Sequence, residues 1–510
     1  MKTLRGHFLL AAVFLFAFAP LARAQDMASF EKRVTVKTLD NGLTVVVCER
    51  PEAPVFSFFT HVDVGSDREY PGIGGLAHMF EHMAFKGTDK IGTNNYPEEK
   101  IALVKVEEAY QAYDRDRRKP FGRDDKKVAE LELAWKDAMT SAQKYVVENQ
   151  FGEIVEENGG EGLNAFTDNE ETGYHYSFPS NRVELWAYLE SERFLHPVLR
   201  EFYKEREVVH EERRLGESDP FERLFEQFLA AAYVAHPYGQ PVVGWPSDLE
   251  SFSMTDAQSY FNKYYLPANM VVTLVGDVKA SEVMPILEKY FGRLPAKPKP
   301  EPLRTVEPPQ DAERIVILHE TTQPIFIEGY HKPSALDKDD AVYDALQDLM
   351  SNGRTSRLYR SLVRDKKIAA FASGFSGVPG AKYPNMFIFF ATSTPGHTPE
   401  EIRDAIHAEI ERVKTADITD EELAMIKTRA KADLIRKLGD NEGLAFELGG
   451  AQSLYGDWRE LFRQVDRIDK VSKADIRRVA NTTFVENNRT IGITETTHTA
   501  QSAPAGKENN

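Results

Sequence analysis

The stretch Gly74-Gly75-Leu76-Ala77-His78-Met79-Phe80-Glu81-His82-Met83 decides how this 510-residue chain is interpreted. It follows a strand candidate and a glycine-rich turn, and it predicts a helix from about Gly74 to Phe85 that Gly87 could cap. Residues four apart in a helix lie one turn above each other on one face. His78 and His82 therefore present two imidazoles to the same point.

Two histidines at this spacing suit zinc, and Glu81 projects near the same side without being a ligand. Zinc lowers the pKa of a bound water to about 7 and polarises a scissile carbonyl, while a neighbouring carboxylate moves the proton of the water to the leaving amine. The motif thus predicts a hydrolase with Glu81 as the general base. The alternative is a pair of structural histidines on an ordinary helix.

A catalytic zinc needs a third protein ligand and an open fourth position. The candidate segment is 201–214, a strongly charged predicted helix in which Glu205, Glu211 and Glu212 are all available. Spacing alone does not choose among these three carboxylates.

The residues before the motif predict strands. Asp40-Asn41-Gly42 lies between two β-rich runs, 34–39 and 43–48, and Asn-Gly predicts a hairpin with a type I′ turn. A third strand candidate spans 55–64. Cys48 is the only cysteine, so no intrachain disulfide can form, and its apolar surroundings favour a buried thiol.

Two further segments mark the domain organisation. Residues 97–150 are charged and helical in pattern with one break at 119–122, which predicts two antiparallel helices. Residues 294–302 hold four prolines and predict a stiff linker. We therefore expect a domain at 25–293, a linker at 294–311, a second domain at 312–495 and a disordered tail at 496–510.

Segments 256–274 and 475–493 align at an offset of 219, which indicates an internal repeat.

The N-terminus predicts export. Lys2 and Arg5 precede an apolar run, and Ala22-Arg23-Ala24 is a small-x-small cleavage site, so residues 1–24 form a signal peptide of a periplasmic or secreted protein. No later stretch is long enough to span a membrane. Cleavage changes the net charge from −17 to −20, because Lys2, Arg5 and Arg23 are lost. This acidity disfavours nucleic acid and anionic membranes as partners.

With these motifs in order, the chain resembles the pitrilysin family, which includes insulin-degrading enzyme and the mitochondrial processing peptidase. The reversed zinc motif H-x-x-E-H is the signature of that family. The resemblance covers essentially all of residues 30–495 and continues beyond the helix of His78 through these segments: 85–88, 164–167, 171–174, 190–193, 205–212, 236–238 and 276–278.

The resemblance implies one Zn²⁺ per chain, with Glu212 as its third ligand and Glu205 as a supporting carboxylate beside the ligands. Between His82 and Glu212 lie 129 residues (212 − 82 − 1), more than is usual in the family, so the helical segment 97–150 is interpreted as an insertion. Asn164 and Ala165 correspond to an edge strand that pairs with extended substrate; the alternative is an ordinary strand end.

In the second half, Arg364 corresponds to an arginine that binds substrate carbonyls. The tyrosine expected seven residues later is Phe371, so a hydroxyl that helps to hold substrate or oxyanion is missing. Either activity is lower or a partner chain supplies this group.

The family fold implies an α+β protein of two similar domains, each a mainly antiparallel sheet packed with helices, that form half of a clamshell. We therefore expect a homodimer, or a heterodimer with a homologous subunit, that cleaves peptides or unfolded polypeptide segments. The rival hypothesis is a non-catalytic, peptide-binding subunit. A third hypothesis is an enzyme that works only beside a partner supplying an arginine and a tyrosine.

Overall fold

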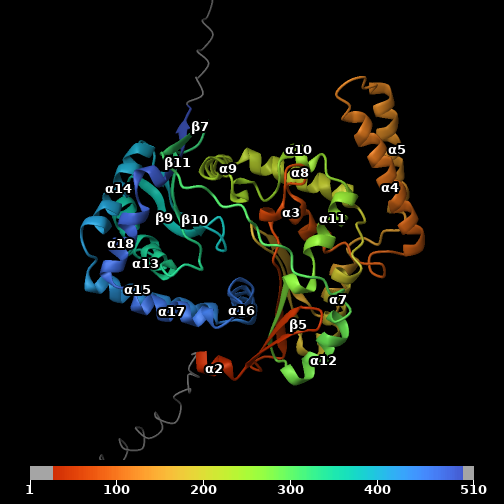
Figure 1. Cartoon of the computed structure of the whole chain (residues 1–510), viewed down its shortest axis with the longest axis horizontal. Coiled ribbons are helices and arrows are strands. Elements are labelled where there is room, and N and C mark those ends of the chain that lie inside the picture. Colours follow the sequence, from red (N-terminus) through yellow and green to blue (C-terminus); the bar gives the residue numbers. More distant parts are fainter. Residues whose placement is uncertain (1–26, 498–510) are drawn as a thin grey trace, which may run out of the picture.

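The chain builds two sheets, one in each half, and a computed structural model describes residues 27–497 (Figure 1). The predicted signal peptide and nearly all of the predicted tail lie outside the described residues. The first sheet has the order β1-β2-β6-β3-β5-β4, and the second has the order β7-β11-β8-β10-β9. Both are mainly antiparallel and packed with helices, so the α+β prediction is confirmed.

The strands of the first sheet are β1 (Val34–Thr38), β2 (Thr44–Glu49), β3 (Val55–Val62), β4 (Glu161–Thr167), β5 (Thr172–Pro179) and β6 (Met270–Gly276). Those of the second are β7 (Arg314–Glu320), β8 (Ile325–Lys332), β9 (Ala369–Val378), β10 (Asn385–Ser393) and β11 (Arg489–Thr496).

The two sheets share one topology, which explains the internal repeat. In the first, β6 is parallel to β2 and antiparallel to β3. In the second, β11 is parallel to β7 and antiparallel to β8. Helix α11 (Met254–Tyr264) leads to β6 and α18 (Lys473–Thr483) leads to β11, and each begins with a capping box. Asn269 and Asn488 donate equivalent hydrogen bonds to the last turns of these helices.

The turn between β1 and β2 differs from the predicted type I′ turn. Leu39 N–H donates to Leu43 O at 2.8 Å across a three-residue loop, and only Gly42 in that loop has a positive φ, 94°. The side chain of Asn41 is buried and donates to the carbonyls of Phe291 and Leu294. This tertiary contact holds Asn41 outside the left-handed conformation that a type I′ turn requires.

Each sheet packs its own helices on one face. The first sheet carries α7 (Val183–Leu195) and α12 (Ala280–Phe291) around the buried Trp186. The second carries α13 (Asp340–Ser351), α14 (Pro399–Thr415) and α18 around the buried Phe387 and Phe389. Both cores are therefore layers of a sheet and its helices.

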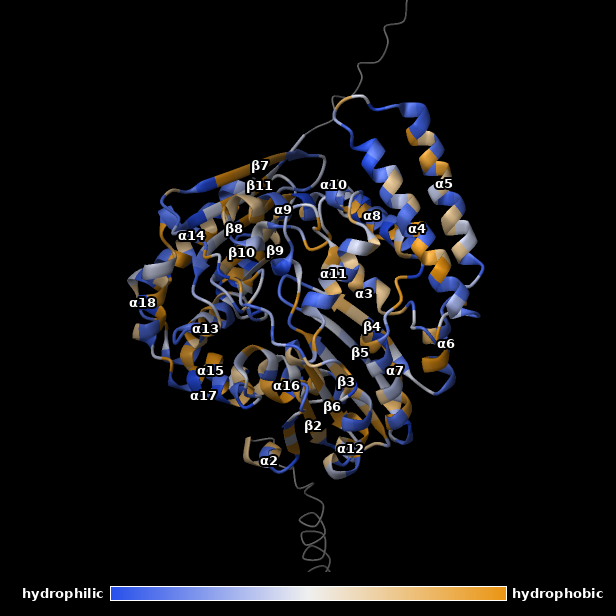
Figure 2. Ribbon diagram, turned by 45° about the vertical axis from the view of Figure 1, so that its right-hand side comes forward, coloured by the Kyte–Doolittle hydropathy of each residue, from blue (hydrophilic) through white to orange (hydrophobic). Residues whose placement is uncertain are grey.

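The opposite faces are covered by exchanged helices (Figure 2). Helix α9 (Pro220–Ala232), from the first half, places Leu224 and Phe228 on the second sheet. Helix α16 (Asn441–Tyr455), from the second half, places Leu444 and Leu448 on β3 and β6 of the first sheet. Each half thus completes the core of the other.

Helices α4 (Tyr96–Arg117) and α5 (Asp125–Gln143) form a hairpin that projects from the body of the molecule (Figure 1). Partway along the hairpin, Tyr110 and Trp135 pack against Tyr203 of α8 (Phe202–Ser218). The remaining helices are α2 (Met27–Glu31), α3 (Leu76–Met83), α6 (Gln150–Glu157), α10 (Pro246–Leu249), α15 (Asp420–Lys437) and α17 (Glu460–Lys470). The short helices are η1 (Ser66–Arg68), η2 (Ser180–Arg182), η3 (Pro237–Gly239), η4 (Pro267–Asn269), η5 (Tyr359–Asp365) and η6 (Glu486–Asn488).

Within residues 27–497 no helix combines the length and the apolar character that crossing a bilayer requires.

Candidate metal centre

Helix α3 carries both histidines of the motif and is held firmly at its start. Gly75 precedes it with φ 95°, a left-handed conformation that glycine adopts without a steric penalty. The carboxylate of Glu69 accepts the N–H groups of Gly75 and Ala77 at 2.8 and 2.7 Å. Burial raises the pKa of Glu69 to about 8. A buried carboxyl group therefore satisfies the free donors at the helix N-terminus.

Helix α8 lies against α3 and brings in the third side chain. Glu212 Oε2 is 3.7 Å from His78 Nε2 and 3.6 Å from His82 Nε2. These three residues form the one group of possible metal ligands among residues 27–497, with ligand atoms within 4.8 Å of one another. Ligand atoms on a tetrahedral zinc with bonds of about 2.0–2.1 Å lie about 3.3 Å apart. The group is therefore slightly wider than a zinc site.

The other two carboxylates considered for α8 point elsewhere. Glu211 is exposed and pairs with Arg214 on the same helix. Glu205 lies two turns before Glu212 on α8. Its Oε2 is 3.5 Å from His82 Nδ1, and its carboxylate also contacts Lys86. The crossing of α3 and α8 thus separates three glutamates that spacing did not distinguish.

The pKa values of the two histidines shift in opposite directions. Burial and the neighbouring His82 lower the pKa of His78 to about 4, so its imidazole is neutral with a free lone pair. Burial opposes the charge on His82, but its contact with Glu205 and the charges of Glu212 and Glu81 raise the pKa of His82 overall. Glu205 faces Nδ1, so in the neutral form of His82 the lone pair lies at Nε2, toward Glu212. Metal binding at Nε2 would therefore release a proton from His82.

Glu81 stands beside the three converging atoms rather than among them. Its Oε2 is 3.9 Å from His78 Nε2. Burial raises the pKa of Glu81, while Thr167 and the charge of His82 act in the opposite direction. A carboxylate with a raised pKa is a stronger base than an exposed one.

Asn164 and Ala165 lie in β4, the outermost strand of the first sheet, and α3 packs against that strand. They pair with His175 and Tyr174 of β5 on one side. On the other side no strand of the described chain pairs with β4. The strand beside the histidines therefore has one edge free for backbone hydrogen bonds.

Arg364 and Phe371 lie in the second half. Arg364, in η5, pairs with its neighbour Asp365 at 2.6 Å. Phe371, in β9, is 46% exposed. Within residues 27–497 neither one has a hydrogen bond or an ion pair with His78, His82 or Glu212. The structure therefore does not bring these two residues to the metal group through direct contact.

No pattern in the sequence predicts the cavity beside Glu212. Its volume is about 570 Å³, and it is lined by Glu212, Phe225 and Leu229, by the loop 239–243 and by Asn169 and Pro379. These residues come from four separate segments, so only the fold brings them together.

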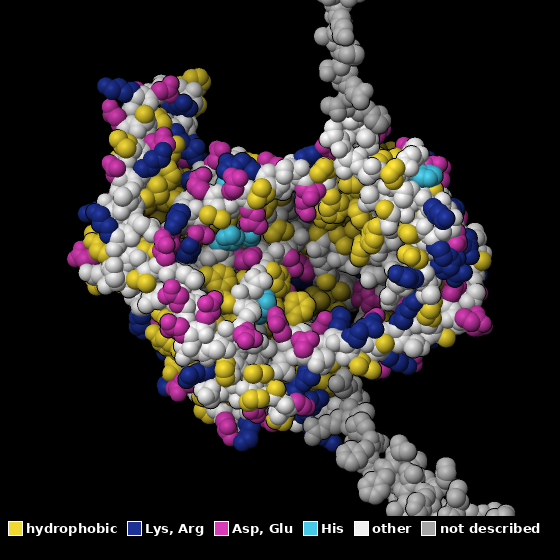
Figure 3. All heavy atoms as spheres, turned by 180° about the vertical axis from the view of Figure 1, so that it is seen from behind, with side chains coloured by type: hydrophobic (Ala, Val, Ile, Leu, Met, Phe, Trp, Pro, Cys, Tyr) yellow, Lys and Arg dark blue, Asp and Glu magenta, His cyan; other side chains and the backbone are white. Residues whose placement is uncertain are grey.

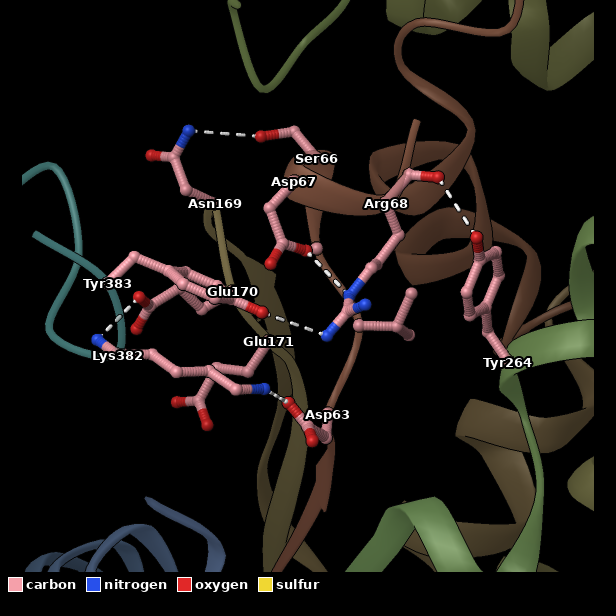
Figure 4. Close-up of polar contacts among 12 residues, drawn as sticks. Asp63, Ser66, Asp67, Arg68, Asn169, Glu170, Glu171, Tyr264, Lys382 and Tyr383 are labelled. Atoms are coloured by element: carbon pink, nitrogen blue, oxygen red, sulfur yellow. Dashed lines mark hydrogen bonds and ion pairs between the residues drawn. The ribbon is translucent and has the colours of Figure 1, made fainter. Parts of the chain in front are cut away.

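A polar network next to this cavity joins the two halves (Figure 4). Glu170, in the turn between β4 and β5, accepts the N–H groups of Ala381 and Lys382 from the second half at 3.0 and 2.7 Å. Lys382 in turn contacts Asp63, at the end of β3. The turn that follows the edge strand is thus fastened to the second half.

In the second half α13 takes the place of α3. One face of α13 is apolar and buried, and the other lines a cavity of about 740 Å³ with Asp344, Gln347 and Asp348. Helix α13 follows β8 as α3 follows β3, and its Leu346, Leu349 and Met350 are buried in the second core. Ile426 and Ala430 of α15 pack into the same core. Among the described residues of this half, no three possible metal ligands converge as they do in the first half.

Comparisons with known proteins agree with this division. A family model described as insulinase (peptidase family M16) matches residues 44–109 and 137–245, and one described as the peptidase M16 inactive domain matches residues 251–430. The insulinase model leaves residues 110–136 of this chain unmatched, and these residues lie in the hairpin of α4 and α5. The hairpin is thus the part of the first half that departs most from the family pattern.

Relatives match along nearly the whole chain. The zinc protease PqqE of Helicobacter pylori is 29% identical, over 94% of this chain and 96% of its own. The probable mitochondrial-processing peptidase subunit beta of Schizosaccharomyces pombe is 24% identical, over 87% of each chain.

Among solved structures, a protease from Helicobacter pylori matches with a TM-score of 0.75 and 27% identity, over 91% of this chain and 99% of that one. The first half of the periplasmic protease PqqL of Escherichia coli matches in fold, with a TM-score of 0.67 and 16% identity, over 91% of this chain and 92% of that one. The chain belongs to peptidase family M16, the insulinase or pitrilysin family.

Proposed function

We propose that this protein is a zinc-dependent endopeptidase that hydrolyses peptides or unfolded polypeptide segments, with one Zn²⁺ held by His78, His82 and Glu212 and with Glu81 as the general base. Its family and the zinc proteases among its relatives support a peptidase function. The observation that carries the proposal is the convergence of two imidazole Nε2 atoms and one carboxylate oxygen beside a second carboxylate that is not among them.

Each residue has a distinct task in this mechanism. Zinc, when bound, supplies Lewis-acid chemistry that polarises a peptide carbonyl. Glu81 takes a proton from the attacking water at its carboxylate and delivers it to the leaving amine. Glu205 holds the Nδ1 proton of His82, which keeps the Nε2 lone pair directed at the site.

The edge of β4 would bind the substrate backbone in an extended conformation, with Asn164 and Ala165 in the paired segment. Folded proteins have few free extended segments, which favours peptides and unfolded chains as substrates. Arg364 would bind substrate carbonyls from the second half, and Phe371 provides no hydroxyl there.

We further propose export to the periplasm or beyond, and assembly as a homodimer or with a homologous subunit. A neighbour in fold that is named as a periplasmic protease and a relative named as a processing-peptidase subunit support these two points. The second half matches the inactive domain of the family, so a non-catalytic, peptide-binding role remains the second candidate.

Glu81→Gln separates the two candidates. We expect the wild-type protein to contain one zinc per chain and to cleave unstructured peptides, and the variant to retain its zinc but lose at least about a hundredfold in turnover, because proton transfer is removed while the ligands stay. Elemental analysis and a quenched-peptide assay measure both properties. Equal turnover in both proteins would refute the assigned base, and a zinc-loaded wild type that binds peptides without cutting them would favour the binding role.

A further inference from the structure

The hairpin of α4 and α5 ends in a bare loop. Residues 118–127, which we name the hairpin tip, are all exposed, and Phe121 within them is 91% exposed. A Cβ on the adjacent Gly122 would meet nothing within 4 Å, so the tip has open space around it. Figure 3 shows the hairpin projecting from the body, with hydrophobic side chains and Lys and Arg side chains together at its top. The hairpin tip therefore presents a large apolar ring to water at the end of a projecting arm.

The charge of this region is opposite in sign to that of the whole chain. The full sequence has 63 basic and 80 acidic side chains, whereas residues 114–127 have seven basic and four acidic ones. All four acidic side chains are engaged within the hairpin: Asp114 with Arg117 and Arg118, Asp116 with Lys119 and Lys127, Asp125 with Arg123, and Asp124 as the cap of α5. Among the residues that the structure describes, Arg115 and Lys126 have no ion pair. Because salt screens charges beyond about 8–10 Å, a surface that approaches the hairpin tip meets a net positive charge.

The hairpin tip is braced against the body of the molecule. Arg117 Nη2 donates to the carbonyl of Glu250 at 2.7 Å, and Arg118 Nη2 donates to that of Ser251 at 3.0 Å. These bonds act together with the aromatic contacts that the hairpin makes with Tyr203 of α8. The fold therefore fixes the direction in which the tip points.

A single aromatic ring among basic side chains on a projecting tip fits the surface of an anionic lipid bilayer. Aromatic rings favour the headgroup layer of a membrane, and basic side chains are attracted to anionic lipids within a Debye length of the surface. Long Lys and Arg side chains can keep their charges among the phosphates while a neighbouring ring enters the apolar layer. A stable protein partner would instead need an apolar patch of many residues with a polar rim. One ring does not supply such a patch.

We propose that the hairpin tip docks the protein on bilayers that contain anionic phospholipid, with the Phe121 ring in the headgroup layer and the surrounding basic side chains, Lys126 among them, on the lipid phosphates. The net negative charge of the chain opposes this contact only from a distance, because screening leaves the contact itself to the local charge of the tip. The docking uses no residue of the candidate metal centre and is independent of the proposed peptidase function. Residues 110–136 are unmatched by the insulinase family model, so the tip lies where the chain departs from the family pattern.

Binding to lipid vesicles tests the proposal. Every protein is prepared without the predicted signal peptide, because its apolar run would itself bind lipid. In about 0.1 M salt, we expect the protein to sediment with vesicles of phosphatidylglycerol and phosphatidylcholine, and to bind phosphatidylcholine alone at least about tenfold more weakly. Phe121→Ser should weaken binding to the mixed vesicles about ten- to a hundredfold, because the buried ring is lost. Lys126→Glu should weaken it about tenfold.

Matched controls separate the hairpin tip from exposed side chains in general. Leu133→Ser, on α5 below the tip, removes another apolar side chain, which is 61% exposed. Lys338→Glu makes the same charge change at an exposed lysine of the second half. Both should bind the mixed vesicles as the wild type does, and so should Glu81→Gln, since the metal centre takes no part. Losses in Leu133→Ser and Lys338→Glu as large as those in the tip variants would overturn the proposal.

A probe at position 121 distinguishes insertion from electrostatic attraction alone. Cys48 is buried and is the only cysteine of the chain, so Phe121→Cys can be labelled selectively with a polarity-sensitive fluorophore. The emission of this label should shift to the blue on mixed vesicles, whereas the same label on Leu133→Cys should not shift. An unchanged spectrum at position 121, or undiminished binding by Phe121→Ser, would overturn the proposal. So would a lower molar mass of Phe121→Ser by light scattering, because the ring would then join two copies of the chain.

Discussion

At the scale of single residues, the candidate site depends on which side of α8 each glutamate faces. Glu212 meets the Nε2 atoms of both histidines, and Glu205 meets Nδ1 of His82. Glu211, beside Glu212 in sequence, points to solvent and pairs with Arg214. Three residues of one type thus have three different roles, set by the direction of their side chains.

Glu205→Gln tests the supporting role. An amide in place of the carboxylate no longer favours the tautomer of His82 that binds through Nε2, and we expect zinc affinity to fall about 10- to 100-fold. Competition with a chromogenic chelator measures this affinity. Glu211→Gln on the same helix is the matched control and should leave it unchanged. A normal affinity in Glu205→Gln would remove Glu205 from the site.

At the scale of elements, α3 is the part that positions the site, and its start tolerates little change. A Cβ at Gly75 would lie 2.6 Å from the carbonyl oxygen of Val243, whereas a Cβ at Gly72 would meet nothing within 4 Å. Both glycines have positive φ, 95° and 102°. The two positions therefore separate the cost of the backbone conformation from the cost of the collision.

We predict that Gly72→Ala lowers the free energy of unfolding by about 1–2 kcal/mol, the cost of a left-handed conformation alone. Gly75→Ala should lower it further and weaken zinc binding, because the collision shifts the first turn of α3. Urea unfolding and zinc titration measure the two effects. Equal stability losses in both variants would show that the loop 239–243 simply moves aside.

The hairpin of α4 and α5 is an element that the sequence marked by composition alone. Its charged surface and helical pattern are local properties, so both helices could be predicted. Its attachment through Tyr110, Trp135 and Tyr203 could not, because Tyr203 is distant in sequence.

At the scale of the whole molecule, the exchange of α9 and α16 makes the two halves interdependent. Leu448 of α16 is fully buried against the first sheet. Removing α16 would expose the apolar face of β3 and β6, and removing α9 would do the same to the second sheet. The halves are therefore expected to unfold together.

Leu448→Ala tests this coupling. The cavity left against the first sheet should lower the free energy of unfolding by about 2–5 kcal/mol. Circular dichroism and tryptophan fluorescence should both report one unfolding transition, shifted to lower denaturant concentration by the same amount. Ile435→Ala, at a side chain that is 55% exposed, is the control and should change it little. Two separate transitions, only one of which moves, would contradict the coupling.

His236 makes the junction of the halves sensitive to acid. It is buried against Tyr238 and against Tyr383 of the second half, and its backbone N–H donates to Glu307 of the linker. Burial lowers the pKa of His236 from 6.5 to about 4. Between these two values the unfolded chain binds more protons than the folded one, so stability falls as the pH falls.

We therefore predict that the free energy of unfolding decreases from about pH 6.5 toward pH 4 and that His236→Asn makes this decrease shallower. Asparagine keeps an oxygen that can accept the N–H of Tyr238, as His236 Nδ1 does now. His319→Asn, on the exposed surface of β7, is the control and should keep the wild-type slope. Denaturant unfolding at several pH values gives the slopes, and identical slopes in all three proteins would refute the role of His236.

The sequence by itself determined the elements whose signals are local: the helix of His78 and His82, the hairpin of α4 and α5, and the capped helices that reveal the repeat. A resemblance in motifs also pointed to Glu212. Tertiary structure alone decided the turn at Asn41, the crossing that turns Glu212 toward the histidines, and the exchange of α9 and α16. The physical reason is that periodicity and capping act between residues a few positions apart, whereas packing joins residues whose separation along the chain carries no pattern.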